Sequence, residues 1–500
     1  NKKEIVDKDV SKSFKLYLGE KYYEAIQNII KDLDMQYKLI VINYLLSCDK
    51  NLFNQLNIIL PSQYKILLDN INKNDVGDSE IALLSKIKME YEKFNNIRGK
   101  DMCDNLISIV VFSDNTIDSE NIDIIKEYTN NKFELILVNN NATSYENAEC
   151  INEYENQADG FNKALKRAKG QFIMFLDNAI IVTPNYMDKM LEAFVLNDKV
   201  GAVGPLFNNI AGQAIDGCKG KESLVEYSKM IENNNKHIYS KRLSLHGSCL
   251  LLKKEVVNDV GKFDYNMENM AIWDDLSCRL ILAGYNLILS ADTYVFNLGE
   301  PFLRQSYSNF KKKWGFDFFY SNGCRFDLLN MMNLKLNKIN ILEIGCACGG
   351  TLLEISNRNN TANLYGIEIN KNAANIAKMF ANVSSADIEN GDLPYERLFF
   401  DYVIFGDVLE HLYNPQKVLE NIKPYLKEDG KIIASIPNIQ HWTIIEELLN
   451  GYWTYTKAGI LDETHLRFFT QTEITKMFDE AGIDYPTADW TWDDVTEAAK

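Results

Sequence analysis

Acidic residues stand at the ends of two successive apolar runs in the last third of the chain. Glu343 lies near the end of the first run, and a turn containing Gly345 and Gly349 follows it. Glu368 lies at the end of the second run. A carboxylate beside a glycine turn repels pyrophosphate and suits a cationic amino-acid group, while one at the next strand end suits two ribose hydroxyls. The turn also lacks the G-x-G-x-x-G spacing of dinucleotide sites, so we predict a nucleoside ligand with a cationic end.

The elements around these carboxylates are predicted to be strands of one parallel sheet. The runs 340–344, 364–369 and 401–406 are apolar enough to be buried on both faces. The helix predicted after the first run, at 351–355, offers free backbone N–H groups at its start. A ligand is therefore expected at the carboxyl ends of the strands.

In combination, these features closely resemble the class I methyltransferases that use S-adenosylmethionine (SAM). The resemblance covers about residues 320–485 and includes the stretches 407–412 and 465–470, the latter typical of sugar- and small-molecule O-methyltransferases. Ala347 stands where the family usually has a glycine, and alanine is the mildest replacement. A doubly wound domain that binds another ligand is the alternative. The resemblance implies that the cofactor is bound by Glu343, Gly345, Cys346, Gly349, Glu368, Ile369, Asp387, Ile388, Asp407 and Val408.

Two histidines are candidates for the base that a hydroxyl acceptor of the methyl group would need. His411 and His465 carry imidazoles, which titrate near neutral pH. His465 is favoured because it lies in a polar stretch before aromatic residues, whereas ordering of the loop explains His411 equally well. Trp442, Trp453 and Tyr455 are predicted to stack on a sugar ring or to pack in the core.

A second series of alternating strands and helices lies between residues 105 and 315. The runs 106–112, 133–138 and 172–176 predict another parallel sheet. Taken in order, this region resembles family 2 glycosyltransferases of the GT-A fold, which implies a nucleotide-sugar donor and a glycan or glycosylated acceptor. The resemblance implies that the donor is bound by Phe112, Asn115, Asn139, Asn162, Asp177 and Asn178.

The region departs from that family at the residues that would hold a metal ion. Asp177 is the first aspartate of the family's Asp-x-Asp motif, but the second falls on Ala179, and the late histidine falls on Asn297. We therefore predict no metal site and regard a divalent metal as doubtful. The base is expected at Asp274 or Asp275, although both could instead cap the following helix.

The composition of the chain argues against broad nucleic-acid binding and against a membrane-spanning segment. The chain has 500 residues and a net charge of −17, which argues against broad nucleic-acid binding. Nine scattered cysteines favour reduced thiols in a cytoplasmic protein, and no apolar run is long enough to span a membrane. The tail after residue 483 is too short and polar for a final hairpin, so we expect an incomplete sheet or a natural chain that continues beyond Lys500.

We predict an α/β protein with two doubly wound domains after a helical N-terminal region. The predicted boundaries are 1–104 for the helical region, 105–315 for the glycosyltransferase-like domain and 316–500 for the methyltransferase-like domain. The predicted function is glycosyl transfer combined with O-methylation of a sugar hydroxyl. The alternatives are a methyltransferase whose first domain only binds the acceptor, and a non-enzymatic scaffold.

Overall fold

The computed structural model describes residues 105–113, 117–140, 145–194, 199–218, 220–236, 238–302, 305–390 and 393–483. The predicted helical region and the predicted donor-site residue Asn115 lie outside these residues. The chain divides into two compact units, and the second begins at Ser306. The domain boundary at residues 315 and 316 stays a prediction. Among the described residues, no helix is both long enough and apolar enough to cross a membrane.

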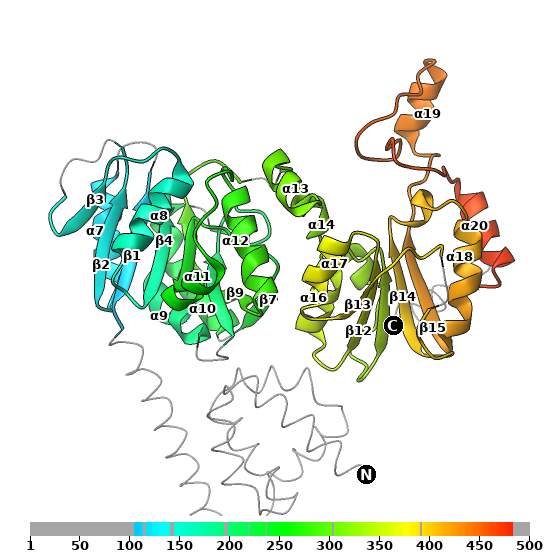
Figure 1. Cartoon of the computed structure of the whole chain (residues 1–500), viewed down its shortest axis with the longest axis horizontal. Coiled ribbons are helices and arrows are strands. Elements are labelled where there is room, and N and C mark those ends of the chain that lie inside the picture. The colour runs from blue at the N-terminus through cyan, green and yellow to red at the C-terminus, as the bar shows by residue number, and fades with distance from the viewer. Residues whose placement is uncertain are drawn as a thin grey trace, which may run out of the picture. The chain divides into compact units, whose positions relative to one another are not determined.

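The first unit is built on a mixed sheet of eight described strands in the order β3-β2-β1-β4-β8-β6-β9-β7 (Figure 1). Strands β3 to β4 in that order run parallel, and β8 is antiparallel to β4. The short strand β5 directly follows β4 in the chain and pairs antiparallel with β10, which follows β9. The strands are β1 (Ile107–Phe112), β2 (Phe133–Val138), β3 (Ala148–Ile151), β4 (Phe172–Asp177), β5 (Ile180–Ile181), β6 (Val200–Leu206), β7 (Tyr239–Arg242), β8 (Cys249–Lys253), β9 (Asn286–Tyr294) and β10 (Phe296–Asn297).

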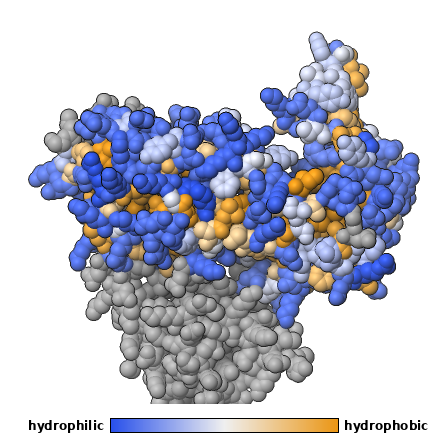
Figure 2. All heavy atoms as spheres, viewed as in Figure 1, coloured by the Kyte–Doolittle hydropathy of each residue, from blue (hydrophilic) through white to orange (hydrophobic). Residues whose placement is uncertain are grey.

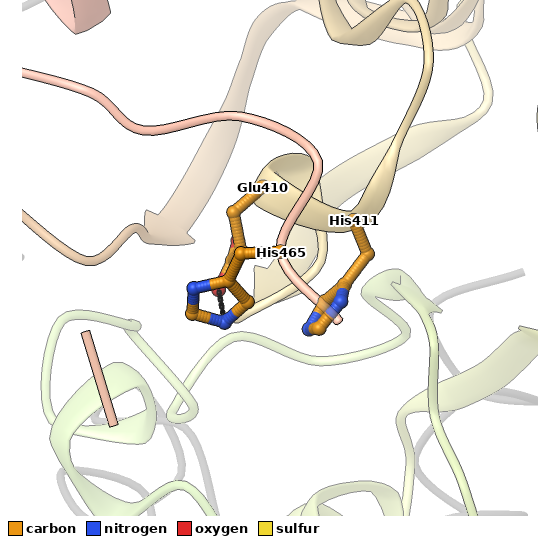
Figure 3. Close-up of side chains that lie close together, drawn as sticks. All are labelled: Glu410, His411 and His465. Atoms are coloured by element: carbon orange, nitrogen blue, oxygen red, sulfur yellow. Dashed lines mark ion pairs between the residues drawn. The ribbon is translucent and has the colours of Figure 1, made fainter. Parts of the chain in front are cut away.

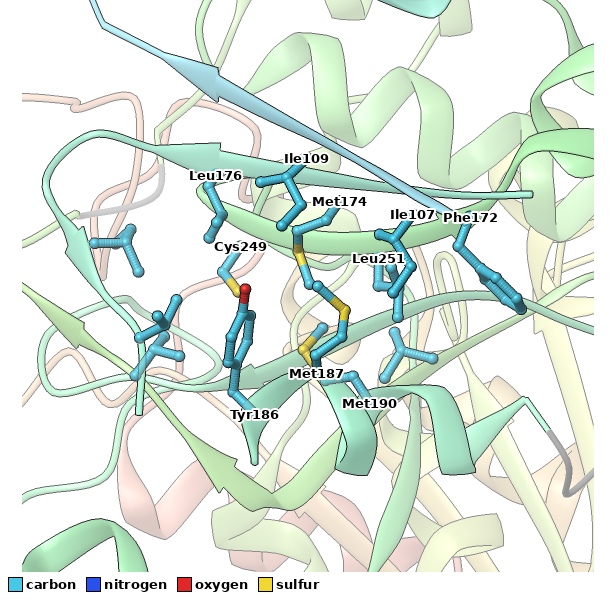
Figure 4. Close-up of a cluster of buried hydrophobic side chains, with 14 of the residues drawn as sticks. Ile107, Ile109, Phe172, Met174, Leu176, Tyr186, Met187, Met190, Cys249 and Leu251 are labelled. Atoms are coloured by element: carbon cyan, nitrogen blue, oxygen red, sulfur yellow. The ribbon is translucent and has the colours of Figure 1, made fainter. Parts of the chain in front are cut away.

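Helices connect and cover these strands. In α9, Tyr186, Met187 and Met190 face the apolar side chains of β1, β4 and β8 (Figure 4). The buried Tyr186 hydroxyl is hydrogen-bonded to Thr129 Oγ1 at 2.9 Å, so its polar end is satisfied within the core. The helices are α7 (Ser119–Tyr128), α8 (Gln157–Arg167), α9 (Tyr186–Ala193), α10 (Leu224–Asn235), α11 (Lys254–Val260) and α12 (Ala271–Leu282), with the 3₁₀ turn η1 (Lys221–Ser223).

The second unit contains a sheet of five described strands in the order β13-β12-β11-β14-β15, all parallel. Its strands are β11 (Asn340–Ile344), β12 (Asn363–Glu368), β13 (Asn382–Ser385), β14 (Phe400–Gly406) and β15 (Leu426–Ser435). Its helices are α13 (Ser308–Trp314), α14 (Phe318–Ser321), α15 (Phe326–Leu329), α16 (Gly350–Arg358), α17 (Lys371–Ala377), α18 (Pro415–Ile422), α19 (Trp442–Leu449) and α20 (Gln471–Glu480), with the 3₁₀ turns η2 (Leu409–His411) and η3 (Lys423–Tyr425).

Both faces of this sheet are buried, as parallel strands require. Along β14, Val403 and Phe405 join one apolar cluster, while Tyr402 and Ile404 join another on the opposite face. The predicted fold class, two α/β units of the GT-A and doubly wound types, is confirmed for the described residues.

Candidate active sites

The turn between β11 and α16 forms the floor of the candidate cofactor site. Gly345, Ala347 and Gly349 all have positive φ, at 68°, 47° and 80°. A Cβ added at Gly345 would lie 2.6 Å from Val408 Cγ2, so the turn packs tightly against the end of β14. Ala347 holds a left-handed conformation that costs an L-residue about 1–2 kcal/mol. The replacement of the family's glycine is therefore less mild than the sequence indicates.

Glu368 ties the turn to the end of β12. Its side chain is 8% exposed, and its two carboxylate oxygens accept hydrogen bonds of 2.7 Å from the backbone N–H groups of Ala347 and Asn370. Each oxygen keeps a second lone pair that can accept from a ligand hydroxyl. Glu368 thus supports the turn and offers a ligand site at the same strand end.

Glu343 is buried beneath the turn. Burial raises the pKa of Glu343 to about 8, an effect that a hydrogen bond from Thr351 and the charge of Arg325 partly oppose. Its Oε2 has no hydrogen-bond partner among the described residues. A buried carboxyl with a spare oxygen is suited to pair with a cationic group of a ligand.

Asp407 is held at the end of β14 by two neighbours. Its Oδ2 accepts from Arg325 Nη1 at 2.6 Å, and its Oδ1 accepts from Ser435 Oγ at 2.7 Å. Arg325 also binds Asp327 through two nitrogens, so the guanidinium is fixed by carboxylates on two sides. Sequence reasoning did not assign Arg325 to the site, because it lies 82 residues from Asp407.

The remaining predicted cofactor residues are distributed around the same sheet edge. Cys346 is buried in the turn, and Ile369 is exposed directly after β12. Asp387 closes its own loop by accepting from the Glu389 N–H and from Asn390 Nδ2. Ile388, which follows it, packs against the apolar cluster that includes Val403 and Phe405.

Glu410, His411 and His465 lie together beyond the end of β14 (Figure 3). His465 Nε2 is 4.0 Å from Glu410 Oε1, and the two imidazole rings cross with their centroids 4.8 Å apart. Burial raises the pKa of Glu410 to about 7 and lowers the pKa of His411. The structure therefore brings the two predicted base candidates together and adds a carboxylate that sequence reasoning had not assigned to the site.

The aromatic residues after β15 stand on a projecting segment. Figure 1 shows α19 extending away from the sheet of its own unit, and Figure 2 shows apolar side chains on that projection. Trp442 is 66% exposed, so it does not pack in a core. Trp453 and Tyr455 contact Phe468, whose ring lies 6.2 Å from that of His465. Contacts between aromatic rings therefore connect Trp453 and Tyr455 through Phe468 to His465, which lies beside His411.

In the first unit, the two expected metal-ligand positions lie side by side. Asn297 pairs with Ile180 across β10 and β5, and the Leu298 N–H donates to the Ala179 carbonyl. Asp177 Oδ1 accepts from the Ala179 N–H at 3.0 Å. Asn297 uses its amide to hold the loop, binding Asn209 Oδ1 and the Gly299 N–H.

The predicted donor-site residues near these positions are engaged within the fold. Asn139 is buried and donates to the Ser113 carbonyl at 2.6 Å. Asn162 uses both amide atoms to clamp the backbone of Phe263. Phe112 packs edge-on against Phe161. In the same region, Asn178 Oδ1 accepts from the Asp118 N–H at 3.0 Å.

The two candidate bases of the first unit have different partners. Asp275 is fully buried and bound through two nitrogens of Arg279, at 2.9 and 3.0 Å. Asp274 Oδ1 accepts from Ser244 Oγ at 2.8 Å. Trp273 occupies the position of the family's aspartate and lies against Gly247, where an added Cβ would be 1.8 Å from Trp273 Cε2. Asp275 is therefore occupied by a structural ion pair, which leaves Asp274 as the better candidate.

Family models match both units. Residues 119–261 match the model described as glycosyl transferase family 2, and residues 321–486 match the model described as methyltransferase domain. The chain carries a glycosyltransferase domain and a methyltransferase domain. Both are enzyme domains, so the prediction of an enzyme is confirmed.

Several known proteins are similar to one domain or the other. The ubiquinone biosynthesis O-methyltransferase of Aeromonas salmonicida is 24% identical over 149 residues, which are 29% of this chain and 62% of that protein. Crystal structures of GalNAc-T7 with UDP, GalNAc and Mn²⁺ (14% identity, TM-score 0.34) and of the plantazolicin methyltransferase BpumL (25% identity, TM-score 0.25) are also similar. They cover 44% and 31% of this chain, and 50% and 59% of their own chains.

Proposed function

We propose that the chain is a bifunctional glycan-modifying enzyme. The methyltransferase domain would transfer a methyl group from SAM to a sugar hydroxyl, and the glycosyltransferase domain would transfer a sugar from a nucleotide-sugar donor. The observation that supports the proposal is the position of Glu368, whose carboxylate accepts a hydrogen bond from the glycine turn at the carboxyl end of β12. The seven free cysteines among the described residues accord with a reducing, cytoplasmic location.

Each acidic residue around the turn would bind or shape a different part of the SAM site. Glu368 would accept from the ribose hydroxyls, and Glu343 would pair with the ammonium of the methionine part. Asp407, fixed by Arg325, would shape the wall beside Val408. SAM supplies an activated methyl group on a sulfonium sulfur, and the protein aligns the acceptor oxygen with it and excludes water.

The acceptor hydroxyl would approach from the side of the histidine pair. His465 donates from Nδ1 to the Ile460 carbonyl at 3.0 Å, so its Nε2 carries the lone pair in the neutral ring. This geometry supports His465 as the predicted base, with His411 as its neighbour. The exposed aromatic residues Trp453 and Tyr455 would stack against the acceptor sugar.

The glycosyltransferase domain would act without a divalent cation. Ala179 and Asn297 offer no charged ligand beside Asp177, and Mg²⁺ and Mn²⁺ prefer several oxygen donors. The diphosphate charge would then be met by helix N-termini or basic side chains. The same observation favours a second candidate function, in which this domain only binds the acceptor for methylation.

Calorimetry with SAM tests the proposal. The wild-type chain should bind SAM, and Glu368→Ala should weaken binding by about 1.5–3 kcal/mol, the contribution of hydrogen bonds to a charged group. Glu368→Gln keeps the shape of the side chain and one acceptor oxygen. Because backbone N–H groups donate to both Glu368 oxygens, thermal unfolding of both variants must show that the turn stays folded. Failure of the wild-type chain to bind SAM would favour a non-enzymatic scaffold.

A further inference from the structure

The histidine pair and Glu410 form a built cluster rather than a chance approach of surface side chains. Glu410 and His411 come from η2, while His465 comes from a segment more than fifty residues further along the chain. The Glu410 carbonyl accepts from the backbone N–H groups of both Leu466 and Arg467, at 2.9 and 3.0 Å. These two hydrogen bonds fix the two segments against each other and hold the three side chains in one place.

The carboxylate of Glu410 is buried without a hydrogen-bond donor. The side chain is 1% exposed, and neither carboxylate oxygen has a hydrogen-bond partner among the described residues. His465 Nε2 lies 4.0 Å from Glu410 Oε1, which is beyond hydrogen-bond distance. A charged carboxylate that is buried without a hydrogen-bond donor destabilises the folded protein unless it is paired with a cation or coordinates a metal ion.

In both histidines, Nε2 is the ring nitrogen with a lone pair available for a metal ion. His465 Nδ1 lies 3.0 Å from the Ile460 carbonyl, and His411 Nδ1 lies 3.3 Å from the Thr464 carbonyl. A carbonyl oxygen only accepts, so each Nδ1 carries the proton and each Nε2 keeps its lone pair in the neutral ring. A backbone carbonyl on the remote nitrogen is the arrangement found behind metal-ligating histidines.

We propose that Glu410, His411 and His465 bind a divalent transition-metal ion. One ligand atom from each residue lies within 4.8 Å of the others. Ligands at about 2.1 Å from such an ion are about 3–3.5 Å apart, so side-chain movements on the order of 1 Å complete the site. Two imidazoles and one carboxylate suit Mn²⁺, Fe²⁺, Co²⁺ or Zn²⁺ better than Mg²⁺ or Ca²⁺, which prefer oxygen donors.

The ion deepens the proposed methyl transfer and rests on that function for its role. Three protein ligands leave coordination positions open, and an acceptor hydroxyl would take one of them. Coordination would lower the pKa of the hydroxyl, so that its proton could pass to solvent before the site closes and the resulting alkoxide could attack the methyl carbon. The new O–CH₃ bond forms as the S–CH₃ bond of the sulfonium breaks. His465 would then act as a metal ligand and not as the base.

Cobalt binding tests the metal site directly. Tag-free protein is dialysed against EDTA, freed of chelator and titrated with Co²⁺, whose visible absorption reports coordination by nitrogen and oxygen. The wild-type chain should bind one Co²⁺, and Glu410→Gln, His411→Ala and His465→Gln should each weaken binding by at least about tenfold. His441→Ala is the matched control, since His441 is exposed in the same unit and contacts Thr443 Oγ1 at 2.8 Å. It should leave the affinity for Co²⁺ unchanged.

Two outcomes would overturn the proposal. One is a wild-type chain that binds neither Co²⁺, Zn²⁺ nor Mn²⁺ below millimolar concentration. The other is a set of cluster variants that keep wild-type affinity for Co²⁺, whatever the affinity of His441→Ala. Thermal unfolding and SAM calorimetry of each variant show whether the protein is folded. A chain that binds Co²⁺ at the cluster but ignores SAM would retain the metal site and refute the proposed methyl transfer, so the two failures are distinguishable.

Discussion

Glu368 Oε2 accepts a 2.7 Å hydrogen bond from the backbone N–H of Ala347, a residue held at a φ of 47°. The carboxylate that would bind ribose therefore also holds the left-handed turn. Alanine is strained in this conformation and glycine is not. The backbone conformation of Ala347 therefore lowers the free energy of unfolding, and the rest of the fold compensates for this loss.

Ala347→Gly should stabilise the methyltransferase domain. Relief of the left-handed conformation gains about 1–2 kcal/mol, and the greater freedom of glycine in the unfolded chain removes about 0.4–1 kcal/mol. The net gain should be on the order of 0.5–1 kcal/mol, measured from the midpoint of urea unfolding. Ala373→Gly, a buried position in helix α17, should destabilise the same domain by about 1 kcal/mol. A loss of stability in Ala347→Gly would contradict the strain at this turn.

Affinity for SAM should rise with pH because of Glu343. Its pKa of about 8 means that the carboxyl is neutral near pH 6 before ligand binds. Pairing with an ammonium needs the charged form, so the affinity should increase by up to about tenfold per pH unit between about pH 5.5 and 7. The window stops below the pKa of the ligand's own α-amino group, about 7.7–8.0. Calorimetry of Glu343→Gln should show that this part of the pH dependence is lost.

Glu343 should make the stability of the ligand-free domain fall with rising pH, whereas it makes the affinity for SAM rise. The folded pKa of Glu343, about 8, lies above the ordinary value of 4.5, so its stabilising contribution is complete below pH 4.5 and is lost as pH rises through 8. Without ligand, the free energy of unfolding should fall by up to about 1.4 kcal/mol per pH unit in that window. The decline should be smaller in Glu343→Gln. Equal slopes for the two proteins would show that Glu343 is charged throughout.

The sequence predicted both sheets and the positions of their ligand edges. Glu343 and Glu368 lie near or at the ends of apolar runs and Asp407 follows a third, and the parallel register then places all three strand ends at one edge. What the sequence left open depends on contacts between distant segments. The Arg325–Asp407 pair and the hydrogen bonds from Leu466 and Arg467 to Glu410 form only when the chain folds back on itself. No local pattern signals them.

The sequence also could not show which of two adjacent aspartates on α12 is the candidate base and which forms a structural ion pair. Asp274 and Asp275 are equally acidic and adjacent, but their side chains leave α12 in different directions. One reaches Ser244 and the other reaches Arg279 on the next turn. The likeness to family 2 glycosyltransferases could therefore propose either as the base, and only the packing favours Asp274.

Substitution of the two aspartates should separate catalysis from stability. Asp275→Ala leaves the partly buried Arg279 guanidinium without its ion pair and should destabilise the glycosyltransferase domain by up to about 3–5 kcal/mol, the cost of breaking a fully buried pair. Asp274→Asn keeps the shape and the acceptor oxygen for Ser244, so the domain should stay folded. If Asp274 is the base, sugar transfer should fall by about 10²–10⁴. Thermal unfolding and sugar transfer by the two variants check both parts.

Ala179 and Asn297 lie side by side at the two positions where the metal ligands of a glycosyltransferase are expected. Sugar transfer by the wild-type chain, assayed with a panel of nucleotide sugars, should be unaffected by EDTA because the ligands beside Asp177 are uncharged. The double variant Ala179→Asp/Asn297→His adds a carboxylate and an imidazole at neighbouring positions and should gain affinity for Mn²⁺. Ala179→Asp alone is the control and should gain less. Thermal unfolding must accompany the assay, because Asn297 also holds its loop through Asn209 and Gly299. Wild-type sugar transfer that EDTA abolishes and Mn²⁺ restores would refute the metal-independent site, and other residues would then have to hold the ion.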